Sequence, residues 1–220
     1  EGVPAALPPA PSYADYIRWL TRQESAEAYW REALQGSTQP NEIALPKPAQ
    51  KDEVPFRDIE IELSEELTAS LTALAQSSRV TLNTVMQTLW GLLAGTYSAQ
   101  RDVVFGVTVS GRSAELRDVE SMVGLFINTL PLRVDTSGTE PLADLLQDVQ
   151  SRQIAMSRHE SSRLVDLPRA AALFETILVF ENYPLGEFAA PLRDFDVRDV
   201  SSVEWTHYPL TCFITPGPRL

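Results

Sequence analysis

The stretch MVGLFINTLPLR, residues 122–133, decides the fold. We expect a strand that begins near Val123 and runs to Val134. Pro131 suits an edge strand or a bulge, because proline cannot donate a hydrogen bond to a ladder. Asn128 stands inside this apolar run, and a buried amide needs hydrogen-bond partners. Asn128 therefore either braces the strand or faces a ligand channel.

The run before this stretch predicts a second strand and a sharp turn. Residues 103–109, VVFGVTV, form a continuous apolar and β-branched run, which is typical of a central strand covered on both faces. Ser110, Gly111 and Arg112 then break the strand. They either hold backbone close to a ligand or form a glycine-enabled bend with an exposed arginine, and the pattern alone favours the bend.

The periodicity of the remaining chain predicts alternating helices and strands. Helices are expected at 12–34 with Ser12 as N-cap, from Ser64, from Thr81 and at 142–156. Their expected buried faces are Leu67, Leu71, Leu74 and Ala75; Val85, Met86, Leu89, Trp90, Leu92 and Leu93; and Leu142, Leu145, Leu146, Val149 and Ile154. Further strands are expected at 56–63, 174–180, 195–200 and 210–215. This order predicts an α/β or α+β sandwich in which helices cover one sheet.

Composition excludes several classes of protein. The chain has 220 residues, 44% of them hydrophobic, and a net charge of −12, which fits one globular domain and disfavours a nucleic-acid binder. Cys212 cannot form an internal disulfide and is expected in the core. No run approaches the ~20 apolar residues of a membrane span, and residues 1–11 lack a secretory pattern, so we expect a cytoplasmic protein.

Residues with catalytic chemistry are few. The sequence contains no HExxH, CxxC, Walker or GxSxG pattern, so neither a metal nor a phosphate nor a serine-hydrolase site is predicted. His159 is expected on the surface at a helix end, where the helix dipole favours a cation. His207, between Thr206 and Tyr208, stays open between a surface histidine and a functional one.

Three segments resemble the carboxyl-terminal lobe of a nonribosomal peptide synthetase condensation domain. They are YADYIRW (13–19) with AYW (28–30); residues 103–134; and residues 173–184 with HYPL (207–210). The resemblance implies a chloramphenicol acetyltransferase-like lobe with a mixed sheet covered by helices. It also implies that residues 1–11 are a linker from a missing amino-terminal lobe, and that 12–220 are the lobe itself, truncated at its carboxyl end.

The resemblance further implies a role in amide formation. Two such lobes would enclose a tunnel, where carrier proteins present phosphopantetheine thioesters and an acceptor amine attacks the donor carbonyl. The family's base lies in HHxxxDG, which this chain lacks, so no residue here is expected to be catalytic and no cofactor is expected to bind directly. The implied contribution is a floor loop from Ser110, Gly111 and Arg112, and a tunnel wall that includes Asn128. The implied partners are the amino-terminal lobe, the carrier proteins and adjacent synthetase domains.

One segment departs from the family pattern. The motif HQDYPFE is reduced to HESSRLV, residues 159–165, in which His159 alone is kept. Two other functions stay open: a non-catalytic module of the same fold that docks carrier proteins, and an ester-forming acyltransferase lobe. A lobe without its mate would expose apolar surface, so self-association is expected.

Overall fold

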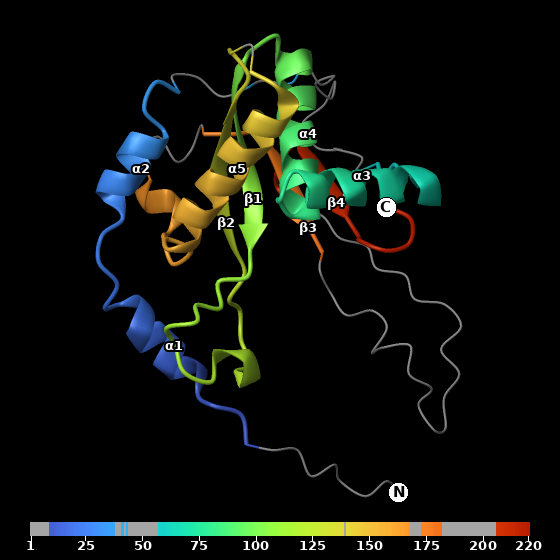
Figure 1. Cartoon of the computed structure of the whole chain (residues 1–220). Helices are drawn as coiled ribbons and strands as arrows, with labels where there is room; N and C mark the ends of the chain where they lie inside the picture. Colours follow the sequence, from blue (N-terminus) through green and yellow to red (C-terminus); the bar gives the residue numbers. More distant parts are fainter. Residues whose placement is uncertain are drawn as a thin grey trace, which may run out of the picture.

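The computed structural model describes residues 9–37, 41, 43, 57–138, 140–167, 173–181 and 206–220 (Figure 1). The predicted strand at 195–200 and residues 182–184 of the third resembling segment lie outside them. In chain order the elements are α1 (Tyr13–Leu20), α2 (Glu27–Ala33), α3 (Glu65–Ser77), α4 (Leu82–Ser98), β1 (Asp102–Val109), η1 (Val119–Ser121), β2 (Asn128–Asp135), α5 (Leu142–Ser157), η2 (Leu164–Asp166), β3 (Thr176–Phe180) and β4 (Leu210–Ile214).

The strands form one mixed sheet in the order β2-β1-β3-β4. β2 runs antiparallel to β1, whereas β3 is parallel to β1 and β4 is parallel to β3. β1 has five consecutive buried residues and lies between two strands, which confirms the prediction of a central strand. Pro131 pairs with Gly106 and lies on β2, the edge strand of the described sheet, so the edge prediction is also confirmed.

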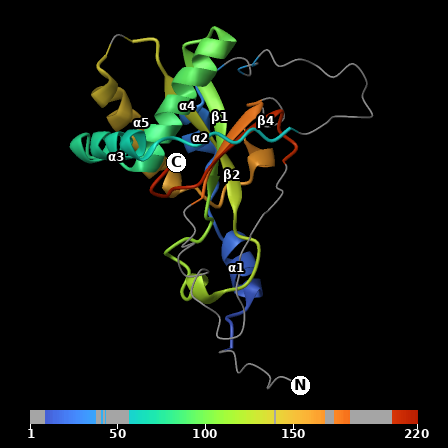
Figure 2. The ribbon, with the colours of Figure 1, turned by 90° about the vertical axis from the view of Figure 1, so that its right-hand side faces the viewer.

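Helices α3, α4 and α5 lie together beside the sheet, and α4 and α5 pack against it (Figure 2). Small residues of α4 face the strands: a Cβ on Gly91 would come within 2.9 Å of Val134 Cβ. Val85 is buried as predicted, but Leu89 and Leu93 are exposed. The predicted face was wrong there, because close packing against β2 selects small side chains over large apolar ones.

The other predicted helices are confirmed with corrections to their bounds and faces. Side chains of Ser64 and Thr81 cap α3 and α4 as expected. The helix expected at 12–34 is two helices, because side chains of Thr21 and Gln23 bond the last carbonyls of α1 and end it. Three residues expected on inward faces are exposed instead: Leu67, Leu142 and Ile154.

The predicted strand at 56–63 was wrong for its described residues, 57–63, which belong to no strand. Ile59 is 82% exposed and Ile61 is 74% exposed. The Leu63 N–H donates to the Leu220 carbonyl at 2.6 Å, a single backbone bond rather than a ladder. Alternation of apolar residues therefore favours an extended chain here, but a strand also requires a paired neighbour.

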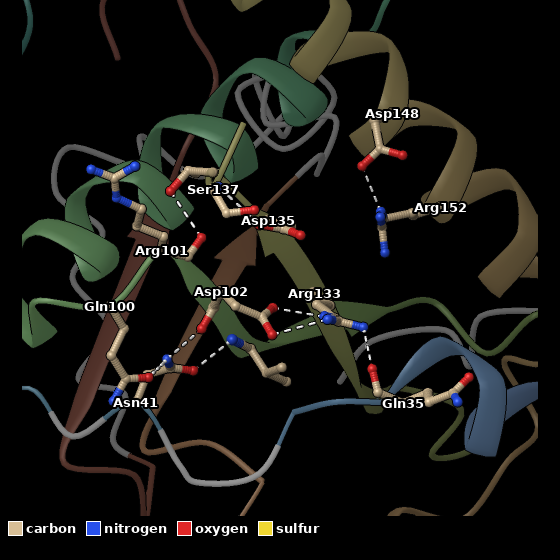
Figure 3. A network of polar contacts seen from close by, with 12 residues as sticks. Gln35, Asn41, Gln100, Arg101, Asp102, Arg133, Asp135, Ser137, Asp148 and Arg152 are labelled. Atoms are coloured by element: carbon tan, nitrogen blue, oxygen red, sulfur yellow. Dashed lines mark hydrogen bonds and ion pairs between the residues drawn. The ribbon is translucent and has the colours of Figure 1, made fainter. Parts of the chain in front are cut away.

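A polar network joins the first strand pair to α2 (Figure 3). Arg133 binds Asp102 through two hydrogen bonds of 2.7 and 2.9 Å, and it donates a third, of 2.7 Å, to the Gln35 carbonyl just beyond α2. Asn41 accepts from the Val104 N–H and donates to the Asp102 carbonyl. These bonds fix α2 and the strand pair as one body.

The sheet also carries the one cysteine. Cys212 lies on β4, half-buried, and its side chain packs against the main core. Burial raises the pKa of the Cys212 thiol above its usual value. The thiol therefore stays protonated at neutral pH and serves as a small packing group.

A second unit stands apart from the sheet. It consists of α1 and the β1–β2 loop, residues 110–127, and both views show it projecting beyond the ends of β1 and β2 (Figures 1 and 2). Its buried side chains form a small core of their own, made of Tyr16, Val119, Met122 and Phe126. The loop is thus a packed element rather than a loose connection.

Candidate functional site

Gly111 determines how the β1–β2 loop leaves the sheet. The last residue pair of the β1–β2 ladder is Val109 with Asn128. Two residues later, Gly111 has φ +64°, and a Cβ there would lie 1.9 Å from the Phe126 carbonyl oxygen. The glycine-enabled bend is confirmed, since both the backbone angle and the close approach require the absence of a side chain.

Arg112 holds the loop together from inside. Its guanidinium donates to the carbonyls of Val119 and Met122, and it lies 4.0 Å from the centre of the Phe126 ring. The side chain is half-buried, so the expectation of an exposed arginine was wrong. The planar fork of arginine suits this position, because it bonds two carbonyls and still stacks on a ring.

Aromatic side chains join α1 to the loop. Phe126 lies 4.5 Å from Tyr16 and 5.2 Å from Tyr13, measured between ring centres. The Tyr13 hydroxyl donates to the Leu125 carbonyl, and a Cβ on Gly124 would collide with the Tyr13 ring. The loop is therefore bound along its second half by a rigid aromatic surface.

The same half of the loop has an exposed apolar edge. Val123 is 77% exposed, Leu125 is 76% exposed and Ile127 is 55% exposed. The three residues alternate in sequence and lie next to the buried Met122 and Phe126. This row is called the apolar edge below.

Asn128 braces the end of the loop. Its Nδ2 donates to the carbonyls of Glu160 at 2.8 Å and Ser162 at 2.7 Å, and its Oδ1 accepts from the Thr129 N–H at 2.9 Å. Both polar atoms of the amide are thus engaged within the protein. Of the two readings of Asn128, these contacts favour bracing.

Glu160 is not one of the predicted site residues, yet it lies beside them. Its Oε2 accepts from the Gly111 N–H at 3.2 Å. Burial raises the pKa of Glu160 above its usual value, and the bond from Gly111 opposes part of that rise. Burial, followed by the charges of Tyr13 and Glu160, also raises the pKa of Tyr16. Glu160 and α1 therefore influence each other electrostatically.

His159 lies on the other side of the same turn. Its ring stacks on Tyr29 of α2 at 4.1 Å between centres, and the Trp30 indole donates to Ser162 Oγ at 2.8 Å. Burial, followed by the charge of Arg158, lowers the pKa of His159. The expected surface cation is therefore corrected to a stacked, half-buried imidazole, whose neutral form is favoured by desolvation.

The structure brings three of the four predicted site residues together. Gly111, Arg112 and Asn128 meet around Phe126 and Glu160, whereas Ser110 is exposed and its Oγ accepts the Arg112 N–H at 3.3 Å. The aromatic spacing of the YADYIRW segment was the available signal for the α1 contact. Nothing local in the sequence marked Glu160, because its partners lie 32 and 49 residues away.

The chemistry available at this site is that of a shaped surface. Among the described residues, no buried side-chain nitrogen or oxygen lacks a hydrogen-bond partner, and no three His, Cys, Asp or Glu side chains gather as metal ligands. No described helix has the length and apolar character to cross a membrane. The arrangement orients backbone and apolar side chains, and its polar groups are used to hold that arrangement.

Comparison with known proteins gives a consistent family. Residues 1–217 match the family described as "Condensation domain". A linear gramicidin synthase of Brevibacillus parabrevis is 40% identical across the whole chain, which covers 4% of that protein. Surfactin synthase subunit 3 of Bacillus subtilis (strain 168) is 37% identical, again across the whole chain, which covers 18% of it. The chain thus spans only a small part of these curated relatives.

Solved structures confirm the fold. The first condensation domain of the CDA synthetase superposes with a TM-score of 0.65 at 21% identity, over 83% of this chain and 41% of that one. The X-domain from teicoplanin biosynthesis gives 0.61 at 24% identity, over 82% of this chain and 43% of that one. The mixed sheet with its covering helices is therefore the fold seen in about two fifths of those chains.

Proposed function

The chain belongs to the condensation-domain family, and on that premise we propose that it is the carboxyl-terminal lobe of a peptide-bond-forming domain in a nonribosomal peptide synthetase. In this proposal residues 12–220 form the lobe and residues 1–11 link it to a preceding amino-terminal lobe. The lobe supplies the floor and one wall of the tunnel between the two. The base in HHxxxDG belongs to the other lobe, so the isolated chain is inactive.

The apolar edge carries the proposal. Three large apolar side chains, at Val123, Leu125 and Ile127, are exposed to solvent on a loop that is anchored by its buried residues Val119, Met122 and Phe126. Such a row on a well-ordered element is typical of a surface that another protein covers. The superposition on 41% of a solved condensation domain supports the amino-terminal lobe as that cover, since the rest of that chain has no counterpart here.

The proposed site residues have distinct parts in the tunnel. Gly111 and Arg112 hold the β1–β2 loop as a rigid floor, through the bend and through the bonds to Val119 and Met122. Asn128 shapes the wall by fixing the turn after α5. Ser110 presents an exposed hydroxyl beside the floor.

The substrates in this proposal arrive on carrier proteins. Each carrier protein delivers its acyl group on a phosphopantetheine arm, and neither arm is bound as a resident cofactor. Relatives named as gramicidin and surfactin synthases support adjacent synthetase domains as partners. The acceptor amine attacks the donor thioester carbonyl, an amide bond forms, and the donor thiol leaves with one proton.

An assay of recombined lobes tests the proposal. Donor and acceptor carrier proteins are loaded, and amide formation is measured with this chain alone and with the separately expressed preceding lobe. Activity only on recombination is the expected result. Activity of this chain alone would overturn the assignment of the base to the other lobe, and inactivity of lobes that bind each other would favour the docking module.

A matched pair of variants tests whether the apolar edge is the contact surface. Leu125→Ser is expected to weaken binding between the lobes by roughly tenfold or more, because it removes about 2 kcal/mol of apolar burial. Val165→Ser is the control, since Val165 is also exposed but lies on η2. Equal effects of the two changes would argue against the apolar edge as the contact surface. Sedimentation of the chain alone should show self-association that Leu125→Ser reduces.

A further inference from the structure

Glu160 contacts both ends of the β1–β2 loop. Its side chain accepts the N–H of Gly111, the second residue of the loop, at 3.2 Å. Its backbone carbonyl accepts Nδ2 of Asn128, the first residue after the loop, at 2.8 Å. One residue from a turn that is distant in sequence therefore contacts both chain segments through which the loop joins the sheet. These two segments, around Gly111 and Asn128, are called the neck below.

The neck requires a hydrogen-bond acceptor from outside β1 and β2. The β1–β2 ladder ends at the pair Val109 and Asn128, so β2 offers no further residue to the backbone of Gly111. Gly111 is buried, and a buried N–H without a partner would cost free energy comparable to a lost hydrogen bond. The Glu160 carboxylate supplies an acceptor at this point.

The turn that carries Glu160 is itself fixed to the main core. The Ser162 carbonyl accepts a hydrogen bond from Asn128, and Ser162 Oγ accepts one from the indole of Trp30, which is 1% exposed. His159, the residue before Glu160, stacks on Tyr29. Glu160 therefore reaches the neck from an anchored position, and its contacts transmit the geometry of the sheet to the loop.

We propose that Glu160 is a positioning residue that sets the angle at which the β1–β2 loop leaves the sheet. It thereby sets where the apolar edge stands. The effect on the loop is a property of this chain alone. The effect on amide formation rests on the proposed function, in which the loop is the tunnel floor, and Glu160 does not touch the reacting atoms.

Among the described residues, the charged and titratable groups near Glu160 are engaged elsewhere. The guanidinium of Arg112 donates to loop carbonyls and the ring of His159 lies against Tyr29, while the charge of Glu160 contributes to the raised pKa of Tyr16 in α1. The Gly111 N–H donates the hydrogen bond that the Glu160 carboxylate accepts. The Gly111 amide should consequently report the ionisation of Glu160.

Amide proton chemical shifts test this contact in the chain as it is. In the wild type, the Gly111 amide shift should follow a titration whose midpoint, the pKa of Glu160, is raised by burial above the ordinary value for glutamate. In Glu160→Gln that titration should vanish. Glu120→Gln is the control, since Glu120 is exposed on the same loop and carries the same charge, and it should leave the titration in place. A Gly111 shift that is flat with pH, or unchanged by Glu160→Gln, would overturn the proposal.

Hydrogen exchange tests the positioning itself. Glu160→Ala should speed exchange of the loop amides by roughly fivefold to tenfold, because a charge-assisted bond at the neck is lost. Glu160→Gln keeps an acceptor oxygen, so its loop amides should exchange within about twofold of the wild-type rate. Amides of β1 serve as the internal reference for folding. Equal loop exchange in Glu160→Ala and the wild type would contradict the proposal.

The recombined domain gives the functional readout. Per folded molecule, Glu160→Ala should lower kcat by about fivefold while the KM for each carrier protein changes less than twofold, and Glu160→Gln should flatten the pH dependence of kcat near the Glu160 titration. A change confined to KM would overturn the positioning role. Inactivity of the recombined wild type would overturn the proposed function, whereas the exchange experiment would still decide whether Glu160 holds the loop.

Discussion

The sheet body and the unit formed by α1 and the β1–β2 loop both bury apolar side chains, but they are fixed in different ways. The body is held by strand ladders and by helices packed at close range, with the Asp102 and Arg133 pair at its end. The loop unit has no ladder beyond Val109 and depends on a glycine bend, one arginine and a few aromatic rings. A cooperative body thus carries an element that can open by itself.

Truncation of one buried side chain to alanine in each region should show this difference most strongly. Leu130 is 0% exposed in the body and Phe126 is 3% exposed in the loop unit. Leu130→Ala should lower the free energy of unfolding by about 2–5 kcal/mol, because it leaves a cavity in the sheet core. Urea unfolding followed by circular dichroism measures this change.

Phe126→Ala is the comparison variant. It should move the same urea transition by less than half as much, while amide exchange in residues 112–127 becomes fast. The reason is that the loop unit can detach before the body unfolds, which caps its contribution to global stability. If both variants shift the transition equally, the two regions form one cooperative unit and the comparison fails.

The bend at Gly111 should give the next largest effect. Gly111→Ala is expected to destabilise the loop unit by about 2–3 kcal/mol, measured by amide exchange in residues 112–127, since it places a Cβ against the Phe126 carbonyl in addition to the unfavourable φ. Gly36→Ala separates the two causes, because Gly36 has φ +89° but, among the described residues, its Cβ would meet Arg133 Nη2 alone, at an ordinary contact distance of 3.6 Å. Gly36→Ala should cost about 1 kcal/mol. Equal costs would show that the collision is relieved by small shifts.

A smaller effect is expected at Arg112. Arg112→Lys keeps the charge but loses the planar fork that reaches Val119 and Met122, so loop amides should exchange roughly threefold to tenfold faster. Arg117→Lys, on the exposed part of the same loop, should change nothing. Matching exchange rates in the two variants would mean that charge alone suffices at Arg112.

The smallest expected effect is a pH dependence at Glu160. The folded pKa of Glu160 is raised, so the folded chain binds more protons than the unfolded chain between the two pKa values, and stability falls as pH rises through that window. Glu160→Gln removes this loss, so its stability relative to the wild type should grow with pH and then level off. Urea midpoints from pH 4 to pH 8 measure the trend, with Glu120→Gln as the charge-matched control. A difference that grows as pH falls would contradict the sign.

Much of the body could be predicted because its signals are local. Ser64 and Thr81 mark the starts of α3 and α4, and the run at 103–109 gives β1 its central place. The predictions failed where the structure depends on contacts with another element of the fold. Residues 57–63 have the alternating pattern of a strand but form no ladder. Leu89 and Leu93 are exposed, because small residues such as Gly91 occupy the side of α4 that packs against the sheet.

The candidate site was less predictable for the same physical reason. Gly111 and Asn128 stood out because their residue types are unusual in apolar runs. The hydrogen bonds of Arg112 and Glu160 are to backbone atoms, which nearly every residue offers, so no sequence pattern marks them. The role of the four predicted residues in a tunnel stays a prediction until the lobes are recombined.

The bonds of Arg112 to main-chain carbonyls have a consequence for engineering. Val119 and Met122 are recognised through oxygens that are the same for all side chains, so the exposed residues between them and Arg112 are free to differ. Residues 114, 115, 117 and 118 could then be exchanged for those of another synthetase, while Gly111, Arg112 and Asn128 are retained together with Leu116, which packs against the core of the loop unit. A chimera built in this way would keep the contacts that fix the loop to the sheet of one lobe and would present the exposed side chains of another.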